Sequence, residues 1–544
     1  MAPEYPTKHP LPPALSAEHR RWGLVTDETL GMTLERAARR LPDHAAVVDV
    51  TMGSPTTFTY AEAQDATERF AGYLRAQGIG PGDLVMVQTP NRAEAVFAAW
   101  AAWRIGAVVN PVVDIYRRHE LGHIVAAARP DAVVTVAEHR GFRAAETFDD
   151  LAGEVGLTLR ARVVVGDEGV GGWTGFHDAV STGGDGSLAH PDPDAPALVL
   201  FTSGTTSLPK GAVHSHRTLI AETLQMANGW SMGWMDRMYL PLPIAHITGV
   251  LFALTVPVYR AGTAVLSRME SLDRMVGEIV EHGITHTAGA PHAFPKLVDA
   301  YEHAGVTEVP LRVMASGGTN VPRVLIESAE ALGINPCRIY GMTEMPTVTM
   351  PTPADTEHQR LETDGIVAPG AACEAIDPET REALPVGTEG ELRVIGPERM
   401  LGYLDPEQSA SQIDRDGWFS TGDLGFVDEH GAVTITGRIK DIINRGGEKF
   451  SAREIEDVLV GHESVAEVAV VAAPDRRYGE VPAAFVVAAG GIDPDEDALA
   501  DLLSVGGVAK QKTPVHWRVV DELPKNASGK VKKFVLVERL HEEL

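Results

Sequence analysis

The sequence predicts a two-part α/β protein, with a large N-terminal domain of several layers and a small C-terminal α+β domain. Its 544 residues exceed one ordinary domain and correspond to about two to four folding units. Helical and strand patterns alternate over residues 56–136 and again over residues 213–340. After Leu392 the pattern changes to shorter strands separated by glycine turns. We therefore expect mostly parallel sheets with helices on both faces, followed by a separate small domain.

The first elements show the alternation most clearly. Thr59 and Glu62 form a capping box at the start of a helix, and Gly-Pro-Gly-Asp at 80–83 predicts that it ends near Gly78. The apolar stripe of this helix consists of Ala66, Phe70, Tyr73 and Leu74. The elements expected next are a strand over 84–89, helices over 93–105 and 120–128, and a strand over 132–136.

The second half is organised around a Gly-, Pro- and Asp-rich loop over 181–196, with a short apolar strand over 198–201 directly after it. In the C-terminal part, Ser451 and Glu454 predict a capped helix over 452–460. Strands are expected over 465–472 and 483–487. We place the large domain at 1–439 and the small domain at 440–544.

Composition excludes several classes of protein. The net charge is −28, so the protein as a whole repels nucleic acid and anionic lipid, and an anionic ligand needs a local positive site. Cys337 and Cys373 fit neither a disulfide framework nor a zinc motif. The N-terminal residues lack the apolar segment of a signal peptide, and no apolar run reaches the ~18 residues of a membrane span. We expect a cytoplasmic protein.

The segment TSGTTSLPKG, at 202–211, is the strongest chemical signal in the chain. It is expected to lie between a strand and a helical segment, where hydroxyls, glycine-freed N–H groups and one lysine could surround a polyphosphate. The alternative is a Ser/Thr-rich surface turn. Because Lys210 precedes the second glycine and no Ser or Thr follows it directly, the segment is not a Walker A loop, which disfavours a kinase. The candidate phosphate-binding residues are Thr202, Ser203, Gly204, Thr205, Thr206 and Lys210.

Five further segments occur in a fixed order after this loop: YGMTE at 340–344, STGD at 420–423, GRIKD at 437–441, NRGGEK at 444–449 and PKNASGK at 524–530. Together with the loop they resemble the adenylate-forming superfamily, which includes acyl-CoA synthetases, luciferases and peptide-synthetase adenylation domains. The resemblance spans most of the chain and implies activation of a carboxylic acid by ATP. One departure is Ser207, because the family usually has glycine there; a left-handed backbone would be strained by serine.

The resemblance implies a role for each matching residue. Attack of a carboxylate on the α-phosphorus of ATP joins two anions, so catalysis should depend on positioning and charge neutralisation. Lys530 would be the cation between the two, the alternative being an ordinary surface lysine beside Lys532 and Lys533. Glu344 would hold Mg²⁺, as suits a hard cation. The other nucleotide contacts implied are Thr343 with phosphate, Tyr340 with adenine, Asp423 and Arg438 with ribose, and Gly318 and Gly341.

Alternatives remain for several of these residues: Tyr340 could be a core tyrosine and Asp423 a turn residue. Lys440 matches the family's hinge, which implies that the small domain is mobile and rotates between adenylation and thioester formation. Rotation would withdraw Lys530 and bring in Gly446 and Gly447, whose bare backbone could line a passage for the pantetheine of coenzyme A. The alternative for the two glycines is a plain hairpin turn.

The acid pocket is also assigned by resemblance. His246 lies where related enzymes place a wall of the acyl pocket, although a histidine among apolar residues can also be a satisfied core residue. The further pocket candidates are Ala290, Ser316, Gly317, Gly318, Thr319 and Met345. Most are small or apolar, which favours a monocarboxylic acid with an apolar body. The stretch 110–121 and the form of 445–449 look most like cyclohexanecarboxylate–CoA ligases and their medium-chain or aryl-acid neighbours.

The expected function is therefore an acid–CoA ligase that uses ATP, Mg²⁺ and coenzyme A. Two alternatives are a ligase that loads a separate carrier protein and a non-catalytic nucleotide-binding regulator of the same fold. His214 and His216 could suggest a metal site, but without a matching cluster a structural or phosphate-proximal role is favoured. We expect small-molecule partners and no nucleic acid, and the sequence leaves a homodimer open.

Overall fold

The computed structural model describes residues 4–7, 12–166, 169–202, 209–268, 271–289, 300–318 and 321–543, apart from positions 302, 304, 307, 322, 353, 491, 493 and 526–528. The chain divides into two compact units. Unit 1 consists of Met1–Thr202, Leu208–Ala372 and Ile395–Phe419, and unit 2 consists of Ser203–Ser207, Cys373–Val394 and Ser420–Leu544. The predicted domain boundary at Lys440 stays a prediction.

Unit 1 contains an eight-stranded sheet with the order β17-β9-β8-β4-β3-β5-β6-β7. From β8 to β7 all neighbours are parallel, whereas β9 pairs antiparallel with β8 and with β17. The strands are β3 (Leu84–Gln88), β4 (Val108–Pro111), β5 (Ala132–Val136), β6 (Ala161–Val165), β7 (Thr174–Gly175), β8 (Pro196–Thr202), β9 (Lys210–Ser215) and β17 (Gly402–Tyr403).

A seven-stranded sheet, also in unit 1, has the order β14-β13-β12-β10-β11-β1-β2. Its neighbours are parallel except for β1 and β2, which pair antiparallel. The strands are β1 (Ala45–Asp49), β2 (Thr56–Thr59), β10 (Arg237–Leu240), β11 (Thr263–Leu266), β12 (His286–Gly289), β13 (Val313–Gly317) and β14 (Asn335–Ile339). The prediction of mostly parallel sheets is confirmed.

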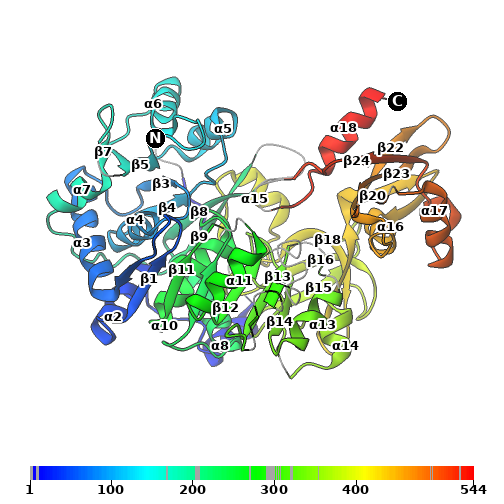
Figure 1. Cartoon of the computed structure of the whole chain (residues 1–544), viewed down its shortest axis with the longest axis horizontal. Coiled ribbons are helices and arrows are strands. Elements are labelled where there is room, and N and C mark those ends of the chain that lie inside the picture. The colour runs from blue at the N-terminus through cyan, green and yellow to red at the C-terminus, as the bar shows by residue number, and fades with distance from the viewer. Residues whose placement is uncertain are drawn as a thin grey trace. The chain divides into compact units, whose positions relative to one another are not determined.

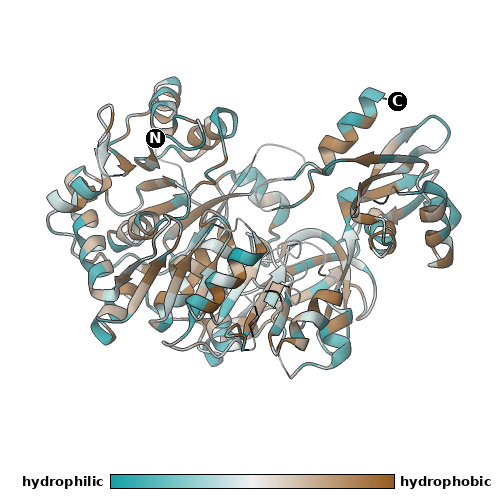
Figure 2. Cartoon of the chain, viewed as in Figure 1, coloured by the Kyte–Doolittle hydropathy of each residue, from teal (hydrophilic) through white to brown (hydrophobic). Residues whose placement is uncertain are grey.

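Helices cover both faces of each sheet. Alternate residues of a strand point to opposite faces, so each strand contributes side chains to two cores. Val85 packs in the core shared by both sheets, whereas Leu84 packs in a second core on the opposite face. Buried residues of α2 (Leu30–Arg40), α3 (Tyr60–Ala76), α4 (Ala93–Arg104), α8 (His216–Gly229) and α10 (Val256–Arg260) join the shared core. The outer helices are α5 (Arg118–Ala128) and α6 (Ala144–Glu154) on the eight-stranded sheet, and α11 (Leu272–Glu281) and α13 (Arg323–Ala331) on the seven-stranded sheet. Figure 2 shows the strands mostly in the hydrophobic colour, as buried sheets require.

The remaining helices of unit 1 are shorter or peripheral. They are α1 (Pro13–Arg21), α7 (Phe176–Thr182), α9 (Ile247–Gly249), the π-helix η1 (Val250–Thr255), α14 (Glu357–Glu362) and α15 (Pro406–Gln412). No described helix is long and apolar enough to cross a membrane.

Unit 2 contains most of a four-stranded sheet and all of a five-stranded sheet (Figure 1). The first has the order β15-β16-β18-β19: β15 (Ala372–Ile376), β16 (Gly390–Ile395), β18 (Phe419–Val427) and β19 (Val433–Arg438). The second comprises β20 (Ile442–Arg445), β21 (Glu448–Ser451), β22 (Val465–Asp475), β23 (Gly479–Ala488) and β24 (His516–Val520). Its helices are α16 (Ala452–Leu459) and α17 (Glu496–Val505) on one face and α18 (Lys533–Glu543) on the other, and short turns η3 (Ile439–Asp441) and η4 (Lys510–Lys512) complete the unit.

Local signals predicted several elements closely. Both bonds of the Thr59–Glu62 capping box are present at the start of α3. The C-terminal capping prediction was wrong in one respect: the hydroxyl of Ser451 caps α16 by accepting from the N–H of Arg453, while the Glu454 carboxylate pairs with Lys512 at 2.7 Å. The long basic side chain of Lys512, in the turn η4, therefore competes successfully for this carboxylate.

Candidate active site

Four segments predicted to form the acid and adenine site meet at one edge of the seven-stranded sheet. Parallel strands place their carboxyl ends at the same edge, which is where open α/β sheets bind ligands. The segments are 241–246 after β10, the end of β12 at Gly289, 316–318 at the end of β13 and 340–345 after β14. The hydroxyl of Ser316 donates to the carbonyl of Gly289 across 3.1 Å, which joins two of the strand ends. Ala290 and Thr319 lie outside the described residues.

Glycines allow these strand ends to pack closely. A Cβ atom on Gly317 would lie 2.2 Å from the carbonyl oxygen of Ile339 on the neighbouring strand. A Cβ atom on Gly341 would lie 1.9 Å from the carbonyl oxygen of Pro346. Gly318 has a φ of 80°, a left-handed backbone that favours glycine. The close turn of the 340–346 loop therefore depends on glycine at position 341, because any larger residue would add a Cβ atom.

Gly341→Ala is expected to destabilise the protein by about 1–3 kcal/mol, because the added methyl group must displace a backbone carbonyl. The apparent Tm and the affinity for ATP should both fall. Gly153→Ala in α6 is the matched control, since a Cβ atom there meets open space. An unchanged Tm for Gly341→Ala would contradict the packing argument.

The 340–346 loop is held by side chains from other parts of unit 1. Nε2 of His214 lies 2.7 Å from the carbonyl oxygen of Thr343. Burial lowers the pKa of His214 to about 4, so the ring is neutral and Nε2 donates to this carbonyl. The hydroxyl of Tyr403 donates to Oε1 of Glu344 across 2.6 Å. Thr343 and Glu344, predicted to contact phosphate and metal, therefore lie in a loop held by His214 and Tyr403, of which the sequence singled out only His214.

Two further predicted residues lie in the same loop. Met345 is fully buried, as expected of an apolar wall. Tyr340 is half-buried, and its N–H donates to the hydroxyl of Thr349 across 2.8 Å. Its predicted contact with adenine stays a prediction.

The phosphate-loop segment differs from its predicted setting. Residues 203–208 lie outside the described residues, and they include four of the predicted phosphate contacts and Ser207. Thr202 and Lys210 are described, and they face each other as partners at the ends of β8 and β9. The segment therefore connects two antiparallel strands, and the expectation of a helix directly after it was wrong. Helix α8 begins only at His216, because residues 210–215 first complete the edge of the sheet.

The histidines in this region make structural hydrogen bonds. Nδ1 of His246 accepts from the N–H of Thr248 across 3.2 Å and caps α9. Nδ1 of His216 accepts from the N–H of Leu30 across 3.2 Å. Burial lowers the pKa of His216 to about 3, so that ring is neutral. His246 is half-buried, and its predicted place at the acid pocket stays a prediction.

The predicted ribose, hinge and catalytic residues all belong to unit 2. The Asp423 carboxylate is 4% exposed and pairs with the guanidinium of Arg438 at 2.7 Å, from neighbouring positions of β18 and β19. Burial, reinforced by Arg438 and Lys530, lowers the pKa of Lys440 to about 8. Arg438 therefore pairs with Asp423, and both Arg438 and Lys530 act on the charge of Lys440.

Gly446 and Gly447 form the turn between β20 and β21. Both have left-handed backbones, with φ of 63° and 96°, as a two-residue hairpin turn requires. The hairpin interpretation is confirmed as a description of the backbone. The predicted contact of this turn with coenzyme A stays a prediction.

A buried carboxylate pair beside the loop was missed by the sequence analysis. Glu222 on α8 and Glu398 are both 0% exposed. Glu222 accepts a hydrogen bond of 2.6 Å from the Thr347 hydroxyl, whereas neither oxygen of Glu398 has a hydrogen-bond partner among the described residues. Burial raises the pKa of Glu222 to about 7, and burial together with Glu222 raises that of Glu398 well above its usual value. A glutamate inside the apolar run LIAETLQMA was the available signal.

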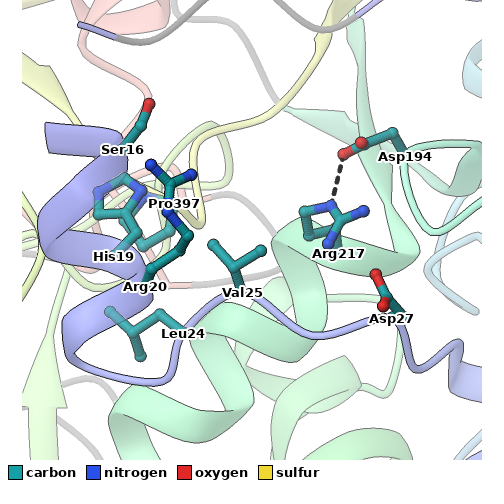
Figure 3. A pocket seen from close by; sticks show the side chains of 9 residues that line it. All are labelled: Ser16, His19, Arg20, Leu24, Val25, Asp27, Asp194, Arg217 and Pro397. Atoms are coloured by element: carbon teal, nitrogen blue, oxygen red, sulfur yellow. Dashed lines mark hydrogen bonds and ion pairs between the residues drawn. The ribbon is translucent and has the colours of Figure 1, made fainter. Parts of the chain in front are cut away.

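Unit 1 also contains a cavity of about 290 Å³ next to α1 (Figure 3). Its charges are largely matched, since Arg217 pairs with Asp194 at 2.8 Å and also donates to the carbonyl of Thr26. The described residues that line it are Ser16, His19, Arg20, Leu24, Val25, Asp27, Asp194, Arg217 and Pro397, and none is a predicted ATP or acid contact.

Comparison with known proteins identifies the family of this chain. Residues 34–404 match the AMP-binding enzyme family, and residues 454–530 match the C-terminal domain of that family. The chain is 31% identical over 537 residues to the medium-chain fatty-acid–CoA ligase of Escherichia coli (strain K12), which covers 96% of this chain and 92% of the relative. It is 32% identical over 498 residues to 4-coumarate–CoA ligase 3 of Oryza sativa subsp. japonica, covering 89% of this chain and 87% of the relative.

Solved structures show the same fold. ATP-bound MatB from Rhodopseudomonas palustris superposes with a TM-score of 0.82 at 29% identity, covering 94% of this chain and 99% of that chain. An ATP-bound chimera of RpMatB and BxBclM gives a TM-score of 0.83 at 30% identity, with the same coverage. The predicted class, AMP-forming acid–CoA ligase, is the class to which the two ligases above belong. The chain belongs to the AMP-binding enzyme family, which confirms both its predicted place in the adenylate-forming superfamily and the prediction that it is an enzyme.

Proposed function

We propose that this enzyme is an ATP-dependent acid–CoA ligase for a mostly apolar monocarboxylic acid of alicyclic, medium-chain or aryl type. The acid is activated as acyl-AMP with release of pyrophosphate, and the acyl group then passes to coenzyme A. The observation that carries the proposal is the meeting of four predicted segments at the carboxyl edge of the seven-stranded sheet. Such an edge is the usual ligand site of an open α/β sheet.

The charges of the described residues suit adenylation. Lys530 provides a cation for the α-phosphate and the acid carboxylate, and Asp423 can accept hydrogen bonds from ribose hydroxyls. Thr343 supplies a hydroxyl for phosphate. The Glu344 carboxylate fits Mg²⁺, because a hard cation prefers carboxylate oxygens and Oε1 is held in place by Tyr403. Bound Mg²⁺ would neutralise phosphate charge.

The acid class is inferred from the pocket side chains. Ser316, Gly317 and Met345 are small or apolar, so they favour a hydrophobic acid body over a second carboxylate. One named relative is a ligase for medium-chain fatty acids and another is a ligase for coumarate, so the family alone does not identify the acid. His246 is placed at the pocket wall by the same proposal.

The experiment is a pyrophosphate-release assay over a panel of acids in the presence of free coenzyme A. Formation of the thioester product is measured in parallel. The expected result is turnover of alicyclic, medium-chain or aryl acids and formation of their CoA thioesters. Preference for long fatty acids or amino acids would overturn the acid class. Pyrophosphate release without thioester would favour a carrier-protein acceptor, and no acid-dependent release would favour a nucleotide-binding regulator.

A further inference from the structure

Tyr403 is a buried side chain that contacts two groups of the proposed ATP site. It is 2% exposed, and its hydroxyl donates to Oε1 of Glu344 across 2.6 Å. The ammonium nitrogen of Lys210 lies 5.1 Å from the centre of its ring, within the range of a cation–π contact. One tyrosine therefore contacts both the proposed metal ligand and the lysine of the phosphate-loop segment.

The backbone around Tyr403 is fixed by strand pairing. Tyr403 faces Ala212 in the antiparallel pair of β17 with β9, the strand that begins at Lys210. The N–H of Leu404 donates to the carbonyl of Gly211 across 2.8 Å. A Cβ atom on Gly211 would lie 2.9 Å from Cδ1 of Leu404, so glycine permits this approach. The backbone of Tyr403 is therefore held at a fixed place relative to the strand that begins at Lys210.

The same segment fixes Glu344. The N–H of Met400 donates to the carbonyl oxygen of Glu344 across 2.8 Å, and Tyr403 binds the carboxylate of the same residue. Two bonds of this kind restrain both the backbone and χ angles of a side chain that otherwise has several rotamers. A phenol has an ordinary pKa of about 10, so at neutral pH it is the donor and Glu344 the acceptor.

We propose that Tyr403 is a positioning residue for metal–ATP binding: its hydroxyl orients the Glu344 carboxylate toward the cation, and its ring keeps Lys210 beside the phosphates. The inference rests on the proposed function, which assigns the metal to Glu344. Partners that orient a metal ligand typically contribute about 10- to 100-fold to metal affinity. The hydroxyl should therefore affect binding of the metal complex, and the ring should also affect binding of ATP alone.

The test measures binding to the full-length chain without any acid, so that no turnover occurs. Free Mn²⁺ is measured by electron paramagnetic resonance in the presence of ATP, and ATP binding without metal is measured by calorimetry in EDTA. Tyr403→Phe is expected to weaken Mn²⁺·ATP binding about tenfold while metal-free ATP binding changes less than about twofold. Tyr403→Leu should also weaken metal-free ATP binding about threefold, because the cation–π contact is lost.

Tyr239→Phe is the matched control. Tyr239 is also buried, its hydroxyl also donates to a glutamate, Glu278, across 2.6 Å, and neither residue is a predicted contact of ATP or metal. It should lose comparable stability without any change in Mn²⁺·ATP binding. If Tyr403→Phe behaves like this control, the inference is overturned.

Glu344→Gln separates the inference from the proposed function. Loss of metal-dependent binding in Glu344→Gln alone, with Tyr403→Phe unchanged, would overturn only the role of Tyr403. Unchanged binding in Glu344→Gln would overturn the metal role of Glu344 itself. In the Glu344→Gln background, Tyr403→Phe should have no further effect, and an additive effect would show that the tyrosine acts elsewhere.

Discussion

Lys530→Ala is expected to lose acid-dependent pyrophosphate release by about 10²- to 10³-fold, because the two reacting anions lose the cation that is proposed to lie between them. ATP affinity should change less than about threefold, since a solvent-accessible charge contributes little to ground-state binding. Transfer of the acyl group from synthetic acyl-AMP to coenzyme A should be retained, because that step is proposed to follow withdrawal of Lys530. Pyrophosphate release and thioester formation are measured separately.

Lys532→Ala is the control for this prediction. It removes the same charge two positions away in the chain, and the release of pyrophosphate should stay within about twofold of wild type. Equal losses in the two variants would mean that the net charge of this segment, and not one lysine, supports adenylation. Loss of both half-reactions in Lys530→Ala would contradict the proposed division of labour between them.

Elements with a local signal were predicted well from the sequence. The strand expected over 132–136 coincides with β5, and the helix expected over 93–105 differs from α4 by one residue. Both depend on periodicity and on turn residues that lie within the segment itself. Strand β17 could not be predicted in this way, because two residues show no periodicity. Its existence depends on β9, which lies almost 200 residues earlier in the chain.

Site residues also divide into those that a local motif predicts and those that only tertiary packing reveals. Asp423 and Arg438 lie in motifs, and the pairing of β18 with β19 then brings them together. The supports of the 340–346 loop lie outside the predicted contacts, because each depends on tertiary packing. Tyr403 follows a glycine in an apolar segment and is indistinguishable from a core aromatic until its partner is known. His214 had a visible motif, but only the fold shows that its partner is the Thr343 carbonyl.

Glu222→Gln is expected to stabilise the protein by an amount on the order of 2 kcal/mol at pH 8, because it removes a charge from a fully buried site. The pKa of Glu222 is raised from 4.5 in the unfolded chain to about 7 in the folded protein. Between these values the unfolded chain releases its proton while the folded protein retains it, so wild-type stability falls as pH rises. The gain in the variant should therefore be largest above pH 7 and small near pH 4.5.

The apparent Tm at several pH values measures this effect. The glutamine keeps the bond with Thr347, since its amide oxygen can accept from the hydroxyl. Glu278→Gln is the contrasting control: the Glu278 carboxylate pairs with Arg274 at 2.8 Å and accepts from Tyr239, so its loss should destabilise. A Glu222→Gln gain that does not depend on pH would rule out a buried charge as its cause.

Glu398→Gln should stabilise for the same reason, and the two gains should not add. Glu222 raises the pKa of Glu398, so replacing Glu222 also relieves repulsion on Glu398. Full additivity in the double variant would mean that the two carboxylates do not interact. Less than additive gains would show that the pair titrates as one unit behind the loop that carries Thr343 and Glu344.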